Sequence, residues 1–201
     1  MKESEFYDAA KETMPVKERA RFLNEQLREI VNYAYHNAPA VKEKMDRVGV
    51  TPSQIATVKD LAKIPITSKD AFSELQKLNP PFGGFLGVPE IKGIFVSPGP
   101  IYEPEIPEVQ YIAAAKALYA AGFRKGDRVI VTVSFHMVPA GEHFAGALER
   151  LGITMIPTGV GNTELQLQIM HDLKVTGYAG TPSFLMTLIK RAEELGYNFR
   201  Q

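Results

Sequence analysis

The chain has 201 residues, 45% of them hydrophobic, so it can bury a substantial core in one or two domains. Its 23 basic and 23 acidic residues balance without a long basic block, which argues against nucleic-acid binding. Cysteine is absent, which excludes disulfides and thiolate metal sites. The segment 1–14 lacks the apolar core of a signal peptide, and no apolar run reaches membrane-spanning length. We therefore expect a cytoplasmic protein without a membrane partner.

Residues 1–89 are predicted to form a helical region that ends in a linker. From Pro15 to Asn37, apolar residues recur at three- and four-residue spacing while charged residues occupy the other faces, which predicts one long amphipathic helix. A shorter helix is expected from Pro39 to Val48, because Gly49 suits the end of a helix. The simplest role for this region is packing.

Three further features complete this region. Thr51-Pro52 is typical of a helix start, residues 58–65 are expected to be a plain connector, and Thr67 or Ser68 can cap a helix that runs to Leu78. The segment 79–89 is rich in proline and glycine, which indicates a linker. We place the domain boundary there, with a helical region in residues 1–89 and an α/β region in residues 90–201.

The α/β region is expected to begin with the strand Ile91–Ser97. The next segment, residues 97–107, contains four prolines and is predicted to be irregular. Pro107 is expected to open a helix that ends at Gly122 and that presents an alanine-rich apolar face, which allows close approach to a sheet.

The remainder of the chain alternates three times between a short apolar strand and a helix. The strands are Arg128–Ser134, Ile153–Ile156 and Val175–Ala179. This alternation predicts a mostly parallel sheet with crossover helices, so the fold class is α/β. Ligands of such sheets bind beyond the carboxyl ends of the strands. The loops expected on that shared rim are Ser134–Gly141, Pro157–Thr163 and Gly180–Ser183.

Several features occur together in a distinctive order: the strand ending at Ser97, an alanine-rich helix followed by GFRKGD (122–127), and the motifs GNTELQ (161–166) and GTPSF (180–184). This arrangement resembles phenylacetate–CoA ligases, a branch of the adenylate-forming acyl-CoA synthetase superfamily. The resemblance covers nearly the whole chain but only the N-terminal half of such an enzyme, that is, part of its large domain. It implies ATP-dependent activation of an aryl or other apolar carboxylate to its CoA thioester, with ATP, Mg²⁺ and CoA as cofactors.

The resemblance also implies a phosphate-binding loop after the strand that ends at Ser97, where relatives carry glycine, serine, threonine and a lysine. Here prolines remove N–H donors, and no Lys or Arg lies between Lys92 and Lys116. The nucleotide- or metal-binding candidates are Ser97, Gly99, Tyr102, Glu103 and Glu105. Three interpretations stay open: a rebuilt loop whose carboxylates hold a Mg²⁺ that carries the phosphates, loss of nucleotide binding, or a solvated loop without a ligand.

By the same resemblance, the loop after the Arg128–Ser134 strand lines the acyl pocket. The candidates are Phe135, His136, Met137, Val138, Pro139, Ala140 and Gly141. The imidazole of His136 can recognise a carboxylate as a donor or cation, or it can bond a backbone carbonyl. His136, Glu142 and His143 lack the spacing of a zinc motif, so no metal site is predicted there.

The next two loops supply the cleft candidates. These are Gly159, Gly161, Thr181, Pro182 and Ser183. The two glycines let the backbone approach a ligand or simply make the turn before a helix capped by Asn162 or Thr163. Thr181-Pro182 either caps the next helix or also contributes to the base of the cleft.

Two functions therefore stay open for this chain, and no catalytic residue can be assigned. One is activation of a small-molecule carboxylate. The other is a non-catalytic ligand-binding or scaffold role that needs a separate C-terminal half, because we find no counterpart of the family's adenine-binding segment, ribose-binding aspartate or catalytic lysine before Gln201. The family's sheet would continue beyond this point, so we expect an uncovered apolar edge or helix face and hence a homodimer or a tight partner.

Overall fold

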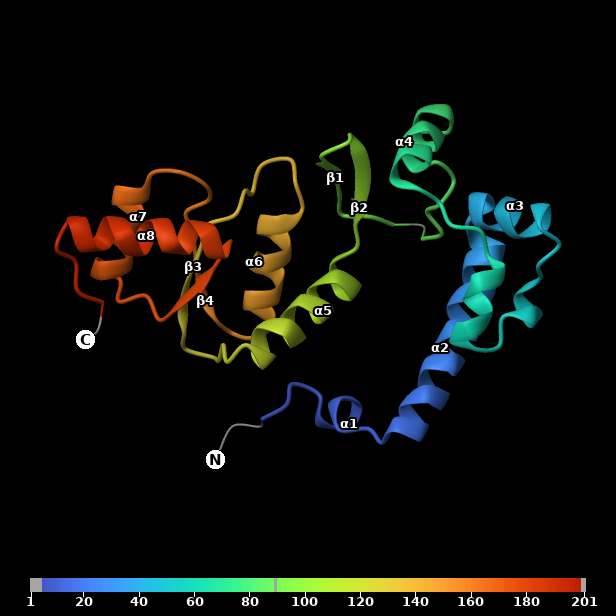
Figure 1. Ribbon diagram of the computed structural model, residues 1–201, viewed down its shortest axis with the longest axis horizontal. Coiled ribbons are helices and arrows are strands. Elements are labelled where there is room, and N and C mark those ends of the chain that lie inside the picture. The colour runs from blue at the N-terminus through green and yellow to red at the C-terminus, as the bar shows by residue number, and fades with distance from the viewer. Residues whose placement is uncertain (1–4, 89, 200–201) are drawn as a thin grey trace. The chain divides into compact units, whose positions relative to one another are not determined.

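The computed structural model describes residues 5–88 and 90–199. The chain divides into two compact units, whose elements are labelled in Figure 1. The first unit is Asp8–Glu105, and the described part of the second comprises residues 5–7 and 106–199. No helix within these described ranges combines the length and the apolar composition that crossing a membrane requires.

The first unit is mainly helical, as predicted. Its elements are α1 (Ala9–Glu12), α2 (Val16–Asn37), α3 (Pro39–Arg47), the 3₁₀ helices η1 (Pro52–Gln54) and η2 (Val58–Lys63), α4 (Lys69–Leu78), β1 (Gly93–Ser97) and β2 (Ile101–Glu105). The predicted cap of α4 is confirmed, because the hydroxyl of Ser68 accepts a hydrogen bond from the Ala71 N–H. The small core of this unit joins α2, α3 and the segment after η1 through Val31, Met45 and Ile55.

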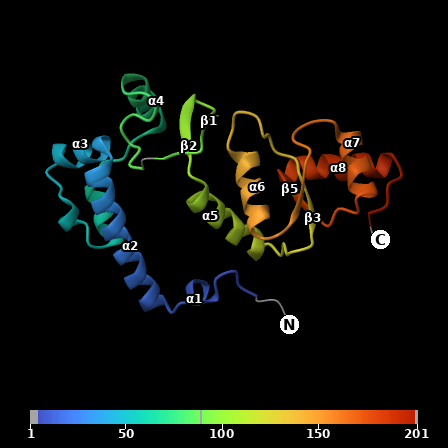
Figure 2. The ribbon, with the colours of Figure 1, turned by 180° about the vertical axis from the view of Figure 1, so that it is seen from behind.

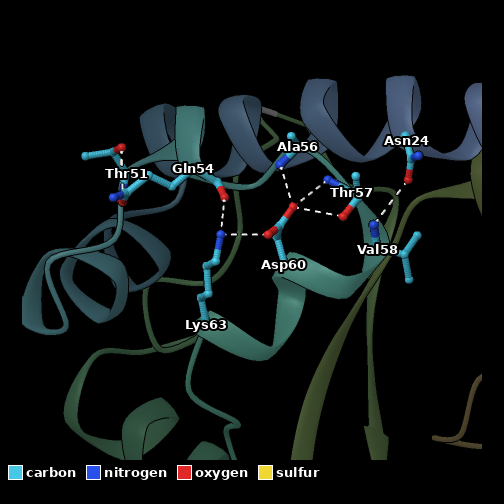
Figure 3. Close-up of polar contacts among 8 residues, drawn as sticks. All are labelled: Asn24, Thr51, Gln54, Ala56, Thr57, Val58, Asp60 and Lys63. Carbon is cyan, nitrogen blue, oxygen red and sulfur yellow. Dashed lines mark hydrogen bonds and ion pairs between the residues drawn. The ribbon is translucent and has the colours of Figure 1, made fainter.

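The plain connector expected over residues 58–65 is wrong, because this segment forms η2 and is tied down by polar contacts (Figure 3). The carboxylate of Asp60 accepts hydrogen bonds from the N–H of Thr57 at 2.8 Å and from its hydroxyl at 2.9 Å. Lys63 donates to the same carboxylate at 2.6 Å and to the carbonyl of Gln54 at 2.9 Å. The Val58 N–H donates to the Asn24 side chain on α2. A reciprocal capping box therefore closes the start of η2, and the Val58–Asn24 hydrogen bond anchors η2 to the long helix.

We expect Asp60→Asn to destabilise the first unit at neutral pH and to lose this effect in acid. Lys63 first, and then the Thr57 donors, hold the pKa of the Asp60 carboxyl below its usual value of 3.8. A depressed pKa stabilises the fold above the unfolded-state value, and this contribution disappears as the pH falls through the lower folded-state value. Urea unfolding followed by helical circular dichroism should thus show a difference from wild type that closes as the pH falls below about 4.

Glu74→Gln is the matched control for this experiment, since it removes one charge from an exposed pair with Lys77 in the same unit. Its effect should be small at every pH, because exposed ion pairs contribute little. A difference between Asp60→Asn and wild type that stays constant down to strongly acidic pH would contradict the proposed role of the charged carboxylate.

The hairpin β1–β2 corrects the prediction that residues 97–107 are irregular. The two strands pair antiparallel from Gly93 opposite Glu105 to Ser97 opposite Ile101. Pro104 is accommodated because this sheet has only two strands, and an edge strand does not need every N–H. The side chain of Gln76 on α4 takes the place of a further strand, because it donates to the Tyr102 carbonyl at 2.7 Å and accepts from the Tyr102 N–H at 2.9 Å.

Through these contacts the hairpin belongs to the first unit. The strand that we expected at the start of the α/β region therefore lies outside the parallel sheet. The division between the units falls after Glu105, whereas the boundary predicted from composition lies in the linker 79–89.

The second unit contains the predicted parallel sheet. Its elements are α5 (Pro107–Ala120), β3 (Arg128–Val131), α6 (Ala140–Arg150), β4 (Thr154–Pro157), α7 (Thr163–Asp172), β5 (Gly177–Ala179) and α8 (Pro182–Glu194). The strand order is β4-β3-β5, and both neighbours run parallel to β3. The α/β fold class is thus confirmed.

Helices cover both faces of this sheet, as Figures 1 and 2 show from opposite sides. On one face α5 and α6 pack against Val129, Val131 and Ala179, as part of one buried cluster. On the other face α7 and α8 lie side by side and pack together through Leu167, Leu188 and Ala192. All three loops at the carboxyl ends of the strands therefore emerge from a sheet that is covered on both faces.

Candidate ligand-binding groove

The loops that follow β3 and β4 enclose a depression at the carboxyl edge of the sheet. We call it the loop depression. It has a volume of about 500 Å³ and is lined by Ser134, Phe135, His136, Pro157, Thr158, Gly159 and Val160. The prediction that these loops share one rim is confirmed for this pair.

A second depression, the helix depression, adds the start of α8. It has a volume of about 370 Å³ and is lined by Thr132, Val133, Ser134, Val160, Gly161, Thr181 and Phe184. Ser134 and Val160 line both depressions, so the two are adjacent. We refer to them together as the groove, to which all three loops contribute. Apolar side chains line both parts, with Phe135, Pro157 and Val160 in the loop depression and Val133, Val160 and Phe184 in the helix depression. Hydroxyls and an imidazole supply polar groups.

Three residues, Thr132, Tyr178 and Thr181, form a hydrogen-bonded chain that we call the floor of the helix depression. Thr132, which is 5% exposed, donates through its hydroxyl to the Tyr178 hydroxyl at 3.0 Å. Tyr178 in turn donates to the Thr181 carbonyl at 3.0 Å. Gly180 lies against this chain so closely that a Cβ there would be 2.1 Å from the Thr132 hydroxyl oxygen. The absence of a side chain at Gly180 is thus a packing requirement of the floor.

Of the seven acyl-pocket candidates, two line the groove and the others lie in the following loop or at the start of α6. Phe135 and His136 line the loop depression, whereas the exposed Met137 has a left-handed φ of 64°. Ala140 and Gly141 begin α6, and Gly141 is buried against Phe135, whose ring carbon Cγ would lie 2.5 Å from a Cβ at that position. Val138 and Pro139 connect the loop to this helix without lining either depression.

His136 presents an exposed side chain to the loop depression. Its backbone is held by Ser134, whose hydroxyl accepts from the His136 N–H at 3.0 Å and donates to the His136 carbonyl at 3.2 Å. Within residues 5–88 and 90–199, the imidazole itself has no hydrogen bond, so the alternative in which it satisfies a backbone carbonyl is wrong. It is available to a ligand as donor or acceptor.

The remaining cleft candidates occupy two helix starts. Gly159 and Gly161 line the groove with φ values of 67° and 82°, a region that favours glycine. Thr181 caps α8 and accepts from the Phe184 N–H at 3.4 Å, whereas Pro182 and Ser183 begin that helix. Asn162 is the N-cap residue of α7, one of the two positions predicted, but it has a left-handed conformation and its side chain makes no capping hydrogen bond.

The nucleotide- or metal-binding candidates lie on the hairpin in the first unit. Ser97 donates to the carboxylate of Glu103, and the Glu105 carboxylate, which is 6% exposed, pairs with Lys92 at 3.3 Å. The Tyr102 side chain is 42% exposed. Across the described ranges, no three His, Asp or Glu side chains come together as a potential metal site.

A lysine from another element lies at the turn of this hairpin, whose own residues 97–101 include none. Lys69, the first residue of α4, places its ammonium 2.6 Å from the Pro98 carbonyl. Gly99 has a φ of 144°, and a Cβ there would lie 3.1 Å from the Lys69 side chain. The turn nevertheless fits a phosphate poorly, because Pro98 and Pro100 have no N–H and the Ser97 hydroxyl is committed to a carboxylate.

Four groups that shape the groove were not predicted: Thr132, Tyr178, Phe184 and the amide of Gln166. Gln166 was visible as part of the GNTELQ motif, and Phe184 as part of GTPSF. Thr132 and Tyr178 could not be identified in the sequence, since each lies within a predicted strand and nothing in the pattern distinguishes it from its neighbours. Their pairing depends on the register of β3 against β5.

Comparisons with known proteins identify relatives for nearly all of the chain. No family model matches it. It is 30% identical over 186 residues to a phenylacetate-coenzyme A ligase of Aromatoleum evansii, which covers 88% of this chain and 41% of that protein. A phenylacetate-coenzyme A ligase of Pseudomonas putida is 32% identical over 183 residues, or 86% and 40% of the two chains. The chain therefore spans less than half the length of these relatives.

Solved structures give the same result for the fold. The crystal structure of 2-hydroxyisobutyryl-CoA ligase in the postadenylation state with 2-HIB-AMP has a TM-score of 0.92 and 28% identity, covering 98% of this chain and 44% of that one. The complex of the same ligase with 2-HIB-AMP and CoA in the thioesterification state has a TM-score of 0.91 and 27% identity, with the same coverage.

Proposed function

Since this chain belongs to the phenylacetate–CoA ligase-like branch of the adenylate-forming acyl-CoA synthetases, we propose that it forms the carboxylate-binding part of an acid–CoA ligase. The observation that carries the proposal is the groove at the carboxyl edge of the parallel sheet. The acid would be an aryl or other apolar carboxylate. By analogy with the complexes of the solved relative, ATP and CoA would be its co-substrates, and the resemblance adds Mg²⁺.

The lining of the groove suits an acid that has an apolar body. Val133, Val160 and Phe184 offer apolar contacts to that body in the helix depression. The carboxylate would lie toward the starts of α7 and α8, where the positive ends of the helix dipoles favour an anion. The His136 imidazole can add a hydrogen bond from the loop depression.

We expect Val160→Trp to lower the affinity of the chain for phenylacetate by about tenfold or more, a loss of roughly 1.4 kcal/mol. Val160 lines both depressions and is 70% exposed, so a larger side chain can fill the groove without entering the core. Ligand-observed NMR or calorimetry with phenylacetate, and with 2-hydroxyisobutyrate in parallel, measures the effect and compares an aryl with a small hydroxylated acid.

Val16→Trp is the matched control, because it places the same side chain at an 85% exposed valine of the first unit. It should bind phenylacetate as the wild type does. Equal affinities for wild type and Val160→Trp, in a variant whose circular dichroism is unchanged, would remove the groove from the acid site.

The alternative function is a non-catalytic ligand-binding or scaffold protein that acts with a separate C-terminal half. The hairpin turn favours it, because the prolines and the Ser97–Glu103 contact leave few donors for a phosphate. Association with a second copy or with such a half also stays a proposal. The half-exposed apolar side chains of Met186 and Ile189 on α8 are compatible with it.

A further inference from the structure

The side chain of Gln166 connects α7 to residues 158–160 of the loop after β4. These residues line the groove, and we call them its wall. It is only 2% exposed, although glutamine is normally found at the surface. Its amide nitrogen lies 2.9 Å from the Gly159 carbonyl and 3.2 Å from the Thr158 hydroxyl. Both partners line the loop depression, whereas Gln166 itself does not.

The hydrogen-bond network determines which way this amide points. A backbone carbonyl can only accept, so the group that faces Gly159 must be the amide NH₂. The Thr158 hydroxyl donates to the Val131 carbonyl at 3.3 Å and therefore accepts from the second amide hydrogen. The Gly159 N–H donates to the same Val131 carbonyl at 3.0 Å, so Thr158 and Gly159 are both hydrogen-bonded to the end of β3. The wall of the groove is thus held between the end of β3 and α7.

The oxygen of this amide is buried and accepts no hydrogen bond from any residue that the structure describes. A buried acceptor without a partner is unfavourable, so a glutamine at this site carries a cost. The NH₂ end must therefore serve a purpose that offsets this cost. The only groups that it contacts in the described part of the chain belong to the wall loop.

We propose that Gln166 is a positioning residue that sets the shape of the acid-binding groove through Thr158 and Gly159. This inference rests on the proposed function, since the ligand of the groove is the proposed carboxylate. Gln166 does not touch the acid. It holds Gly159 in its left-handed conformation and thereby places Val160, which lines both depressions.

Gln166→Glu tests the proposal because its effect depends on pH. The introduced carboxylate would face the Gly159 carbonyl without a proton to donate, and burial raises the pKa of such a carboxyl. At about pH 8 the wall should therefore loosen, whereas at about pH 5 the protonated acid can again donate to Gly159. Gln168→Glu is the matched control, since it makes the same change at an exposed position two residues along the same helix.

Two readouts are compared at each pH, always as ratios to Gln168→Glu. Amide hydrogen exchange of Gly159 reports the wall directly, and phenylacetate affinity reports the groove. We expect Gln166→Glu to exchange the Gly159 N–H about tenfold faster and to bind phenylacetate about tenfold more weakly at pH 8, with both differences shrinking at pH 5. Should Gln166→Glu fail to fold at pH 8, Thr158→Val removes one of the two contacts without burying a charge and should give smaller changes of the same sign.

Three other outcomes would contradict either this inference or the proposed function. Gly159 exchange that is identical in Gln166→Glu and Gln168→Glu would overturn the inference. So would faster exchange that leaves phenylacetate affinity unchanged, because the wall would then not matter for binding. A wild type that does not bind phenylacetate, combined with the expected pH-dependent exchange, would contradict the proposed function and leave the support of the wall by Gln166 intact.

Discussion

Replacing Gly180 with alanine is expected to lower the free energy of unfolding of the second unit by about 1–3 kcal/mol and to weaken phenylacetate binding by about tenfold or more. The new Cβ would lie 2.1 Å from the Thr132 hydroxyl oxygen and 2.5 Å from the Tyr178 hydroxyl oxygen. These separations are far inside van der Waals contact, so Thr132 and Tyr178 must move apart and the floor of the helix depression must change. Urea unfolding and phenylacetate titration measure the two effects.

Two further variants separate the steric effect from the loss of the hydrogen bond. Thr132→Val removes the hydroxyl and leaves Gly180 in place, so it should cost less than Gly180→Ala. Thr132→Ala combined with Gly180→Ala creates room for the new methyl group and should recover part of the lost stability. Full stability and normal binding of Gly180→Ala alone would show that the floor is not as tightly packed as the structure indicates.

We also expect no acid-dependent exchange of pyrophosphate into ATP by the 201-residue chain alone. Formation of an adenylate requires cations or oriented donors around the phosphates. The hairpin turn offers the Lys69 ammonium, but Pro98 and Pro100 donate nothing and Glu103 brings negative charge. Radioactive pyrophosphate, ATP, Mg²⁺ and phenylacetate are the reagents, and a phenylacetate–CoA ligase assayed in parallel is the positive control.

The opposite result would be informative about the same turn. Exchange well above the enzyme-free background that disappears in Glu103→Gln would establish the turn as a metal–nucleotide site. If such exchange disappeared in Lys69→Met, then the lysine from α4 would be the cation that the turn lacks in sequence. Either result would favour catalysis over the non-catalytic alternative.

Much of the second unit could be predicted because its elements carry strong local signals. The apolar strands are bounded by Gly, Pro, Ser or Thr, and Thr181-Pro182 marks the start of α8 at the predicted residue. The hairpin strand Ile101–Glu105 could not be predicted in this way, because Pro104 within it and the prolines on either side argue against a strand. Part of its support comes from Gln76, which lies on α4.

The sequence by itself determined the α/β class, the order of the elements of the second unit and the three loops of the groove, because hydrophobic period and turn residues act over short stretches of chain. Only the tertiary structure decided which side chains meet: Lys69 at the hairpin turn, Tyr178 with Thr132, and Gln166 with Gly159. Two of these three pairs join residues 29 and 46 positions apart. Such contacts depend on strand register and helix packing, and no local pattern in the sequence encodes them.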